Sequence, residues 1–174
     1  PSLLIRVGYN SECGLLHSSS HSDNLKRNIL VMEDIMSCCE RKALQSDRAP
    51  KALGPYSIGV VAGHFLFTSG QIGIDPATGN IVEGGIEAET RQVFANLRAV
   101  LQAGGADLKD IVKTTVFLRD IADFARMNAI YAEYFTENPP ARSAFQVAAL
   151  PKGAAVEIEA VAILPDTDEK CCCG

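Results

Sequence analysis

Residues 86–119 have the sequence IEAETRQVFANLRAVLQAGGADLKDIVKTTVFLR, and this stretch decides the fold. Apolar residues recur in its first half at helical spacing on one face, which predicts a helix. Gly104-Gly105 is typical of the end of such a helix. Ile111–Arg119 then alternates and is rich in β-branched residues, so it predicts a strand. A helix that is apolar on one side only indicates that it covers a sheet.

The sequence on both sides of this stretch predicts the rest of the sheet. Ile58–Ala62 and Phe65–Ser69 are short apolar runs separated by Gly63-His64, and a two-residue break of this kind is typical of a β-hairpin. The later elements are a helix that begins at Asp120 and ends at Asn138-Pro139-Pro140, a strand over Ser143–Ala149 and a last strand over Ala154–Leu164. Two helices cannot cover both faces of such a sheet. We therefore expect an α+β fold with both helices on one face and a partner subunit on the other.

The composition excludes several classes of protein. Hydrophobic residues make up 47% and charged residues 21% of the 174 residues, which is typical of a soluble globular protein. No apolar run approaches the roughly 20 residues that a membrane-spanning helix needs. The net charge of -5, with no basic block, argues against binding to a phosphate backbone. We therefore expect neither a nucleic acid nor a membrane as a partner.

The sequence divides into one domain with an extension at each end. Residues 46–165 carry the predicted strands and the two helices described above, and the segment before them could form only a short helix around Ile29–Arg41. Residues 1–45 lack a clear period and residues 166–174 end in Cys171-Cys172-Cys173-Gly174, so we expect both segments to be disordered, with exposed thiols. The first 22 residues hold several serines and one acidic residue. We expect a cytoplasmic protein, or a mitochondrial or plastid one if this segment is a transit peptide.

The residues of the domain exclude several kinds of catalytic site. Its one histidine, His64, lies in a predicted turn, whereas a Ser-His-Asp triad needs a histidine that a carboxylate holds. No glycine-rich nucleotide motif occurs, and no set of His, Cys and carboxylate residues has metal-ligand spacing. We expect no cofactor and no metal. Arginine, glutamate, hydroxyl, amide and backbone groups remain as the catalytic candidates.

Arg142 and Glu157 are the first of these candidates. Arg142 follows Pro139-Pro140-Ala141 at the start of a strand, where its guanidinium could form two parallel hydrogen bonds to a carboxylate; the alternative is a surface salt bridge. Glu157 and Glu159 lie two residues apart on the last strand and so share a face with apolar residues further along it. Such a carboxylate could deprotonate a water molecule, and the alternative is that this end of the strand is merely solvated.

Tyr56, Ser69-Gly70 and Asn128 are further candidates. Tyr56 follows a Gly-Pro turn and either lines a pocket or fills an edge of the core. Glycine after Ser69 lets a ligand approach backbone N–H groups, although a plain turn explains it equally well. Asn128 lies inside the second helix near its apolar stripe and either caps a loop or contacts a substrate. Together these residues suit a small anionic substrate that water attacks.

Six motifs resemble the Rid/YjgF family of reactive-intermediate deaminases and occur in the order typical of that family. They are GPYS (54–57), FTSGQ (67–71), VKTTVFL (112–118), MNAIY (127–131), PARS (140–143) and VEIEA (156–160). The resemblance extends over about residues 44–165. It implies a chorismate-mutase-like α+β fold with a mixed β-sheet, and a homotrimer with three clefts between subunits.

The resemblance also implies a reaction, the hydrolysis of 2-imino acids such as 2-iminopropanoate and 2-iminobutanoate to 2-keto acids and ammonia. Carried over by position, Arg142 would bind the substrate carboxylate and Glu157 would activate the attacking water. The cleft would be lined by Tyr56 from the neighbouring subunit, Ser69, the Gly70 backbone and Asn128.

Ala144 departs from the family pattern, because many members have cysteine two residues after the arginine. Alanine changes little if this position acts through its backbone carbonyl, but it removes any role of a thiol. Two other functions stay open, a non-catalytic trimer that binds a small ligand or a protein, and a ribonuclease or translation inhibitor. The presence of both Arg142 and Glu157 argues against the first, and the acidic domain argues against the second.

Overall fold

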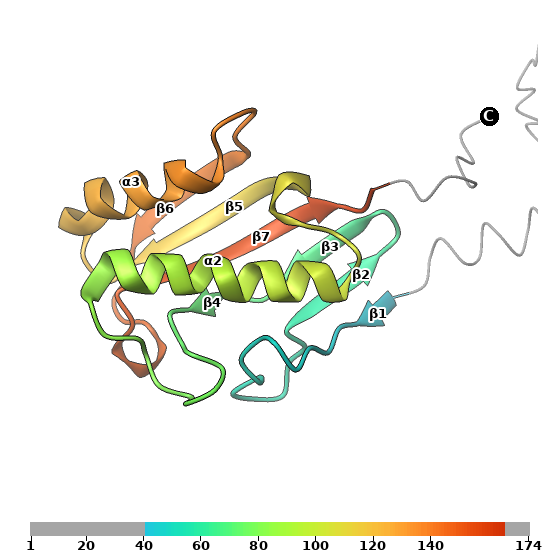
Figure 1. Ribbon diagram of the computed structural model, residues 1–174, viewed down its shortest axis with the longest axis horizontal. Helices are drawn as coiled ribbons and strands as arrows, with labels where there is room; N and C mark the ends of the chain where they lie inside the picture. The colour runs from blue at the N-terminus through green and yellow to red at the C-terminus, as the bar shows by residue number, and fades with distance from the viewer. Residues whose placement is uncertain (1–40, 166–174) are drawn as a thin grey trace, which may run out of the picture. The chain divides into compact units, whose positions relative to one another are not determined.

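In the part of the chain that the structure describes, seven strands form one sheet, and two helices lie along it (Figure 1). The structure, a computed structural model, describes residues 41–165. The predicted extension as far as residue 40 and the cysteine tail 166–174 lie outside the described residues. The strands are β1 (Arg41–Ala43), β2 (Gly59–Ala62), β3 (Phe65–Thr68), β4 (Gln71–Ile72), β5 (Ile111–Leu118), β6 (Ala141–Gln146) and β7 (Val156–Ile163). The helices are α2 (Gly85–Ala103) and α3 (Phe124–Tyr134), with short 3₁₀ turns at Leu108–Asp110, Ile121–Asp123 and Pro151–Gly153.

The sheet is mixed, as the resemblance implied. Its strand order is β1-β2-β3-β7-β5-β6, and β4 pairs with β7 beyond the end of β3. Among the described strands, only β5 and β6 are parallel, and α3 connects them, since a parallel pair needs a crossover of this kind. The predicted hairpin of β2 and β3 is confirmed, with Gly63-His64 as its two-residue turn and Gly63 at φ 57.

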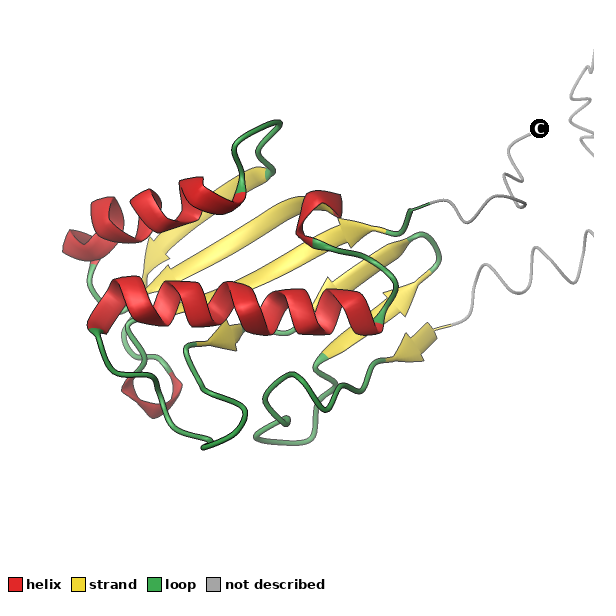
Figure 2. Ribbon diagram, in the orientation of Figure 1, coloured by secondary structure: helices red, strands yellow, loops and turns green. Residues whose placement is uncertain are grey.

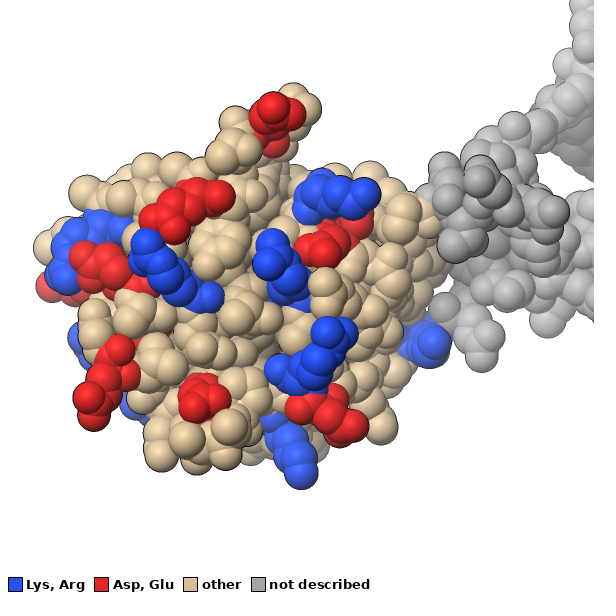
Figure 3. Space-filling model, in the orientation of Figure 1, with Lys and Arg blue, Asp and Glu red and all other residues tan. Residues whose placement is uncertain are grey.

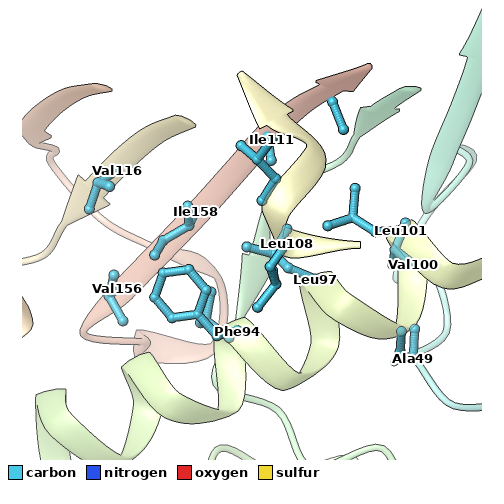
Figure 4. Packing of buried hydrophobic residues seen from close by; sticks show 14 of the residues in the cluster. Ala49, Phe94, Leu97, Val100, Leu101, Leu108, Ile111, Val116, Val156 and Ile158 are labelled. Carbon is cyan, nitrogen blue, oxygen red and sulfur yellow. The ribbon is translucent and has the colours of Figure 1, made fainter. Parts of the chain in front are cut away.

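Both helices cover the same face of the sheet (Figures 1 and 2), which confirms the prediction from the one-sided apolar pattern. In the close-up of Figure 4, Phe94 and Leu97 of α2 point toward the strand that carries Val156 and Ile158. All four side chains are fully buried. Burial of a side chain of this size stabilises the fold by about 1.5–3 kcal/mol, so these contacts fix α2 on the sheet.

The boundaries of several elements differ from the prediction. β1 lies before residue 46, where no strand was predicted, and pairs with β2. β4 was not predicted, because a strand of two residues is too short to show an alternating apolar pattern. β6 begins at Ala141, two residues earlier than predicted. Asp120 caps the 3₁₀ turn by accepting a hydrogen bond from the Ala122 N–H at 2.9 Å, so the α-helix itself begins only at Phe124.

Alternation along β7 distinguishes the two faces of the sheet. Its even-numbered residues from Val156 to Ala162 are buried beneath the helices, on what we term the helix face. Its odd-numbered residues, which include Glu157 and Glu159, lie on the opposite or open face. The open face also carries large apolar side chains that are 45–54% exposed, namely Phe65, Phe67, Phe145 and Ile163. Phe65 pairs with Ile163, and its ring lies 6.3 Å from that of Phe67, so these three side chains form an apolar patch of a kind typical of surfaces that bind another protein.

The outer surface of the helical layer has a different character. Basic and acidic side chains alternate across it, with no region of a single sign (Figure 3). Arg91 pairs with Glu133 at 2.6 Å, and Arg126 pairs with Glu87 at 2.7 Å, so ion pairs link α2 to α3. Within residues 41–165, neither helix is long and apolar enough to cross a membrane.

Candidate functional site

Glu157 lies on the open face near the start of β7. Its Cα partners are Phe117 on β5 and Ile72 on β4, so strands flank it on both sides. The side chain is half-buried, and this burial raises its pKa above the usual range for a carboxyl group. The negative charge of Glu159 on the same face raises the pKa further. A carboxylate with a raised pKa is a stronger base toward a bound water molecule than a solvated carboxylate is.

Ser69 and Gly70 place backbone beside this carboxylate. They occupy the gap between β3 and β4, both of which pair with β7, and the register shifts by one residue across this gap. A methyl group added at Gly70 would overlap Glu157 Oε1 and would lie 2.7 Å from Glu157 Cδ. A larger residue at position 70 would therefore displace the Glu157 side chain, which lies directly over the Gly70 backbone.

The loop that carries Tyr56 is fixed next to Ser69. The Ser69 hydroxyl donates a hydrogen bond to the Ser57 carbonyl at 2.6 Å, and the Ser69 N–H donates one to the Ile58 carbonyl at 3.0 Å. Tyr56 itself is 49% exposed, and its hydroxyl accepts a hydrogen bond from the Leu53 N–H at 3.0 Å. We term Tyr56, Ser69, Gly70 and Glu157 the Glu157 half-site.

Arg142 lies on the other face of the sheet. Its Cα partner on β5 is Thr114, which is buried beneath the helices, so the Arg142 side chain belongs to the helix face. Its guanidinium carbon lies 4.4 Å from the centre of the Tyr131 ring and 5.5 Å from that of Phe124. Both rings belong to α3. Within residues 41–165, no carboxylate forms an ion pair with Arg142.

Asn128 and Ala144 lie close to this arginine. Asn128 is four residues after Phe124 and three before Tyr131 on α3, so the three side chains lie on one side of the helix. Ala144 is two residues after Arg142 on β6, shares its face and packs against the core. We term Asn128, Arg142 and Ala144 the Arg142 half-site.

The structure therefore groups the predicted site residues into two sets and does not bring the sets together. Arg142 is on β6 and Glu157 on β7, with β5 between them, and their side chains point to opposite faces of the sheet. A ligand that one chain binds through Arg142 cannot reach the Glu157 of that chain through the sheet. Each half-site has one charged group and lacks the group of opposite charge.

Two residues near the half-sites were not among the predicted site residues. Tyr131 is buried on the apolar side of α3, and its hydroxyl forms a hydrogen bond with Thr114 Oγ1 at 2.8 Å. Glu89 of α2 is 6% exposed and accepts a hydrogen bond of 2.7 Å from the N–H of Ala155. Ala155 lies two residues before Glu157 in the sequence. When a tyrosine or a glutamate is buried inside an apolar stripe, its polar group needs a hydrogen-bond partner. This requirement is the sequence feature that could have identified both residues. No group of three possible metal ligands occurs within the described part of the chain.

Comparisons with known proteins agree on one family. Residues 46–164 match the family model described as Endoribonuclease L-PSP. The human 2-iminobutanoate/2-iminopropanoate deaminase is 50% identical to this chain over 128 residues, which are 74% of this chain and 93% of the human protein.

Solved structures give the same result. The YjgF gene product from E. coli is 45% identical with a TM-score of 0.67, and the match covers 70% of this chain and 98% of that chain. E. coli TdcF, solved with bound serine, is 42% identical with a TM-score of 0.68, and the match covers 71% of this chain and 99% of that chain. The mixed sheet, its two helices and these matches together establish that the chain belongs to the Rid/YjgF/RutC family, the Endoribonuclease L-PSP family.

Proposed function

We propose that this protein hydrolyses 2-imino acids, such as 2-iminopropanoate and 2-iminobutanoate, to 2-keto acids and ammonia. The observation that carries the proposal is the complementarity of the two half-sites. Arg142 offers a guanidinium without an ion-pair partner among residues 41–165, and Glu157 offers a carboxyl group with a raised pKa. A substrate with a carboxylate beside an electrophilic carbon needs both groups. The human relative bears the name of this deaminase.

In this mechanism, Arg142 binds the substrate carboxylate with two parallel hydrogen bonds. Glu157 accepts a proton from a water molecule while the water oxygen bonds to the imine carbon. The carbon–nitrogen double bond becomes a single bond, and Glu157 then returns the proton to nitrogen. Glu157 next accepts the proton of the new hydroxyl group and passes it to nitrogen, so that the carbon–nitrogen bond breaks, ammonia leaves, and the carbonyl of the 2-keto acid forms. No oxidant or cofactor is needed, because the imine is already electrophilic.

The remaining members of each half-site have supporting roles in the proposal. The Gly70 N–H and the Ser69 hydroxyl help to seat the substrate beside Glu157. Asn128 forms a wall next to Arg142, and Ala144 contributes through its backbone carbonyl. Tyr56 closes the pocket over the substrate. Positioning supplies much of the rate enhancement in reactions of this type.

We further propose that the working form is a homotrimer whose sites lie between copies. Support comes from the opposite orientation of the half-sites and from the exposed apolar side chains of the open face, such as Phe67 and Phe145. A second copy that packs its β6 edge against the open face would bring its Arg142 toward Glu157. Repetition of this contact around a threefold axis would produce three equivalent sites.

The first test measures imine hydrolysis directly. An amino-acid oxidase generates 2-iminopropanoate in situ, semicarbazide traps it, and the protein competes with the trap. We expect the wild-type protein to slow adduct formation, and Arg142→Ala and Glu157→Gln not to do so. If the wild-type protein does not compete although it is folded and oligomeric, the enzymatic proposal is wrong, and the binding of a small ligand or protein becomes the function to pursue.

The second test asks whether one site uses two chains. Arg142→Ala and Glu157→Gln subunits are unfolded together and refolded as a mixture. Each mixed trimer would contain one site with both native groups, so we expect recovery of about a quarter of the wild-type activity. Each variant refolded alone is the control. If the mixture stays inactive although mass spectrometry shows mixed oligomers, sites between copies are excluded.

A further inference from the structure

Tyr131 provides the nearer of the two aromatic rings over which the Arg142 guanidinium lies. The guanidinium carbon is 4.4 Å from the centre of the Tyr131 ring, compared with 5.5 Å for Phe124. Tyr131 is 5% exposed, so it lies within the core rather than on a mobile surface. An arginine over the face of an aromatic ring is attracted by the negative potential of that face.

Several contacts fix the Tyr131 ring in place. Its hydroxyl forms a hydrogen bond of 2.8 Å with Thr114 Oγ1, and Thr114 is the Cα partner of Arg142 across the β5–β6 pair. Its ring lies 5.5 Å from the ring of Phe94 on α2 and 4.7 Å from that of Phe135. Burial raises the pKa of the Tyr131 phenol, so the ring under the guanidinium stays neutral. The Tyr131 ring of α3 thus contacts both β5, through Thr114, and the guanidinium of Arg142.

We propose that Tyr131 is a positioning residue for Arg142, whose guanidinium its ring holds ready for the carboxylate of the substrate. The inference rests on the proposed function, because it gives Arg142 a carboxylate to bind. No described carboxylate competes for this guanidinium, so its N–H donors stay available. A long arginine side chain is flexible, and a ring that restricts it beforehand lowers the entropy lost on binding. Tyr131 acts through Arg142 and does not itself contact the substrate.

Phe124 contributes less to this arrangement. Its ring is more distant from the guanidinium, it is only half-buried, and it lies in the first turn of α3. It has no hydroxyl group that could be anchored to β5. The closer and better fixed ring therefore carries most of the attraction, and substitution of Tyr131 should have the larger effect.

The test alters the electrostatics of the ring at nearly constant size. Tyr131→Phe serves as the parent, and phenylalanine analogues with an increasing number of ring fluorines replace it at residue 131. Fluorine withdraws electron density and weakens the attraction of the ring face for a cation. We expect the KM for 2-iminopropanoate to rise stepwise with the number of fluorines, by about three- to thirtyfold in total, with kcat nearly unchanged. The Kd of pyruvate, measured by calorimetry, should rise in parallel.

The same analogues at Phe135 are the matched control. Phe135 belongs to the same aromatic cluster, but its ring does not lie under the guanidinium. A merely structural role of Tyr131 would give no graded KM effect, or an equal effect at both positions, and either result would overturn the inference.

Pyruvate binding separates the two proposals. If the wild-type protein binds pyruvate through Arg142 but hydrolyses no imine, the proposed function is wrong, and the fluorine series still tests Tyr131 through the Kd. If the wild-type protein is active and neither KM nor Kd responds to fluorination, only the role of Tyr131 is wrong. If no carboxylate binds at Arg142, both proposals are wrong.

Discussion

The Arg142 half-site and the Glu157 half-site differ in what surrounds their charged groups. Arg142 lies over two aromatic side chains, so core residues shape its surroundings. Glu157 lies over the backbone of Gly70 and beside a second carboxylate, that of Glu159. The space that the Glu157 side chain occupies exists because Gly70 has no side chain. Substitutions that remove side-chain atoms should therefore impair the Arg142 half-site, and substitutions that add side-chain atoms should impair the Glu157 half-site.

Gly70→Ala should give the largest effect, a loss of imine-hydrolysing activity of about a hundredfold. The added methyl group would lie 2.7 Å from Glu157 Cδ and would displace the carboxylate from its position. The Glu157 side chain can move away into the open face, so the fold should survive. Activity in the trapping assay and thermal unfolding would be measured together.

Gly54→Ala is the control, because a methyl group there would meet only Tyr56, at the ordinary contact distance of 3.7 Å. It should retain most of the activity. If Gly70→Ala keeps full activity, Glu157 does not need the position that the structure gives it, and the backbone-built description of this half-site is wrong.

Glu89→Leu should destabilise the protein by about 1–3 kcal/mol. The substitution removes the carboxylate that accepts the Ala155 N–H at the start of β7 and leaves that N–H without a partner. Glu89→Gln retains an acceptor oxygen and should cost less. Urea unfolding of the three proteins provides the measurement, and equal stabilities of the Leu and Gln variants would contradict the role of the hydrogen bond.

The acidity of Glu89 adds a pH dependence to this comparison. Burial raises the pKa of Glu89 in the folded protein, more than its hydrogen bond with Ala155 lowers it. The folded state thus favours the protonated form. The stability that protonation contributes is present below the ordinary carboxyl pKa and is lost as pH rises through the raised value. The stability of the Glu89→Gln variant should therefore rise relative to that of the wild-type protein as pH rises from the ordinary carboxyl pKa to the raised value.

The long periodic elements could be predicted from the sequence, and the short ones could not. α2 and β5 carry enough residues for their apolar period to show which side is buried. β1 is three exposed residues and β4 is two buried ones, so neither has a period. Both strands exist because a neighbouring strand supplies their hydrogen-bond partners, and that information lies far away in the sequence.

The arrangement of the candidate site residues could be predicted from the sequence only in part. Alternation along the last strand placed Glu157 and Glu159 on one face, as the structure confirms. The face of Arg142 could not be predicted, because β6 was expected to begin only at Ser143. Its position over Tyr131 depends on the parallel register of β6 with β5, which pairs Arg142 with Thr114. No local pattern encodes such a register.

Glu159→Gln should shift the pH dependence of activity without abolishing it. Burial is the larger cause of the raised pKa of Glu157, and the negative charge of Glu159 raises this pKa further. Glu157 must be deprotonated to accept a proton from water, so kcat/KM should fall as pH falls through its pKa. Removal of the charge on Glu159 lowers this pKa, and the acid limb of the profile should move to lower pH. An acid limb that does not move, or that moves to higher pH, would show that Glu157 does not sense Glu159.

Arg91→Ala should have the smallest effect, because it lies on the outer surface of the helical layer. Arg91 and Glu133 are 47% and 52% exposed, and an exposed pair of this kind is worth less than about 1 kcal/mol. Activity should stay unchanged, and the small loss of stability should vanish at high salt as screening weakens the pair in the wild-type protein. If this substitution instead lowered kcat/KM tenfold in a folded protein, the helical surface would belong to the site. The function would then not depend only on two half-sites that face opposite sides of the sheet.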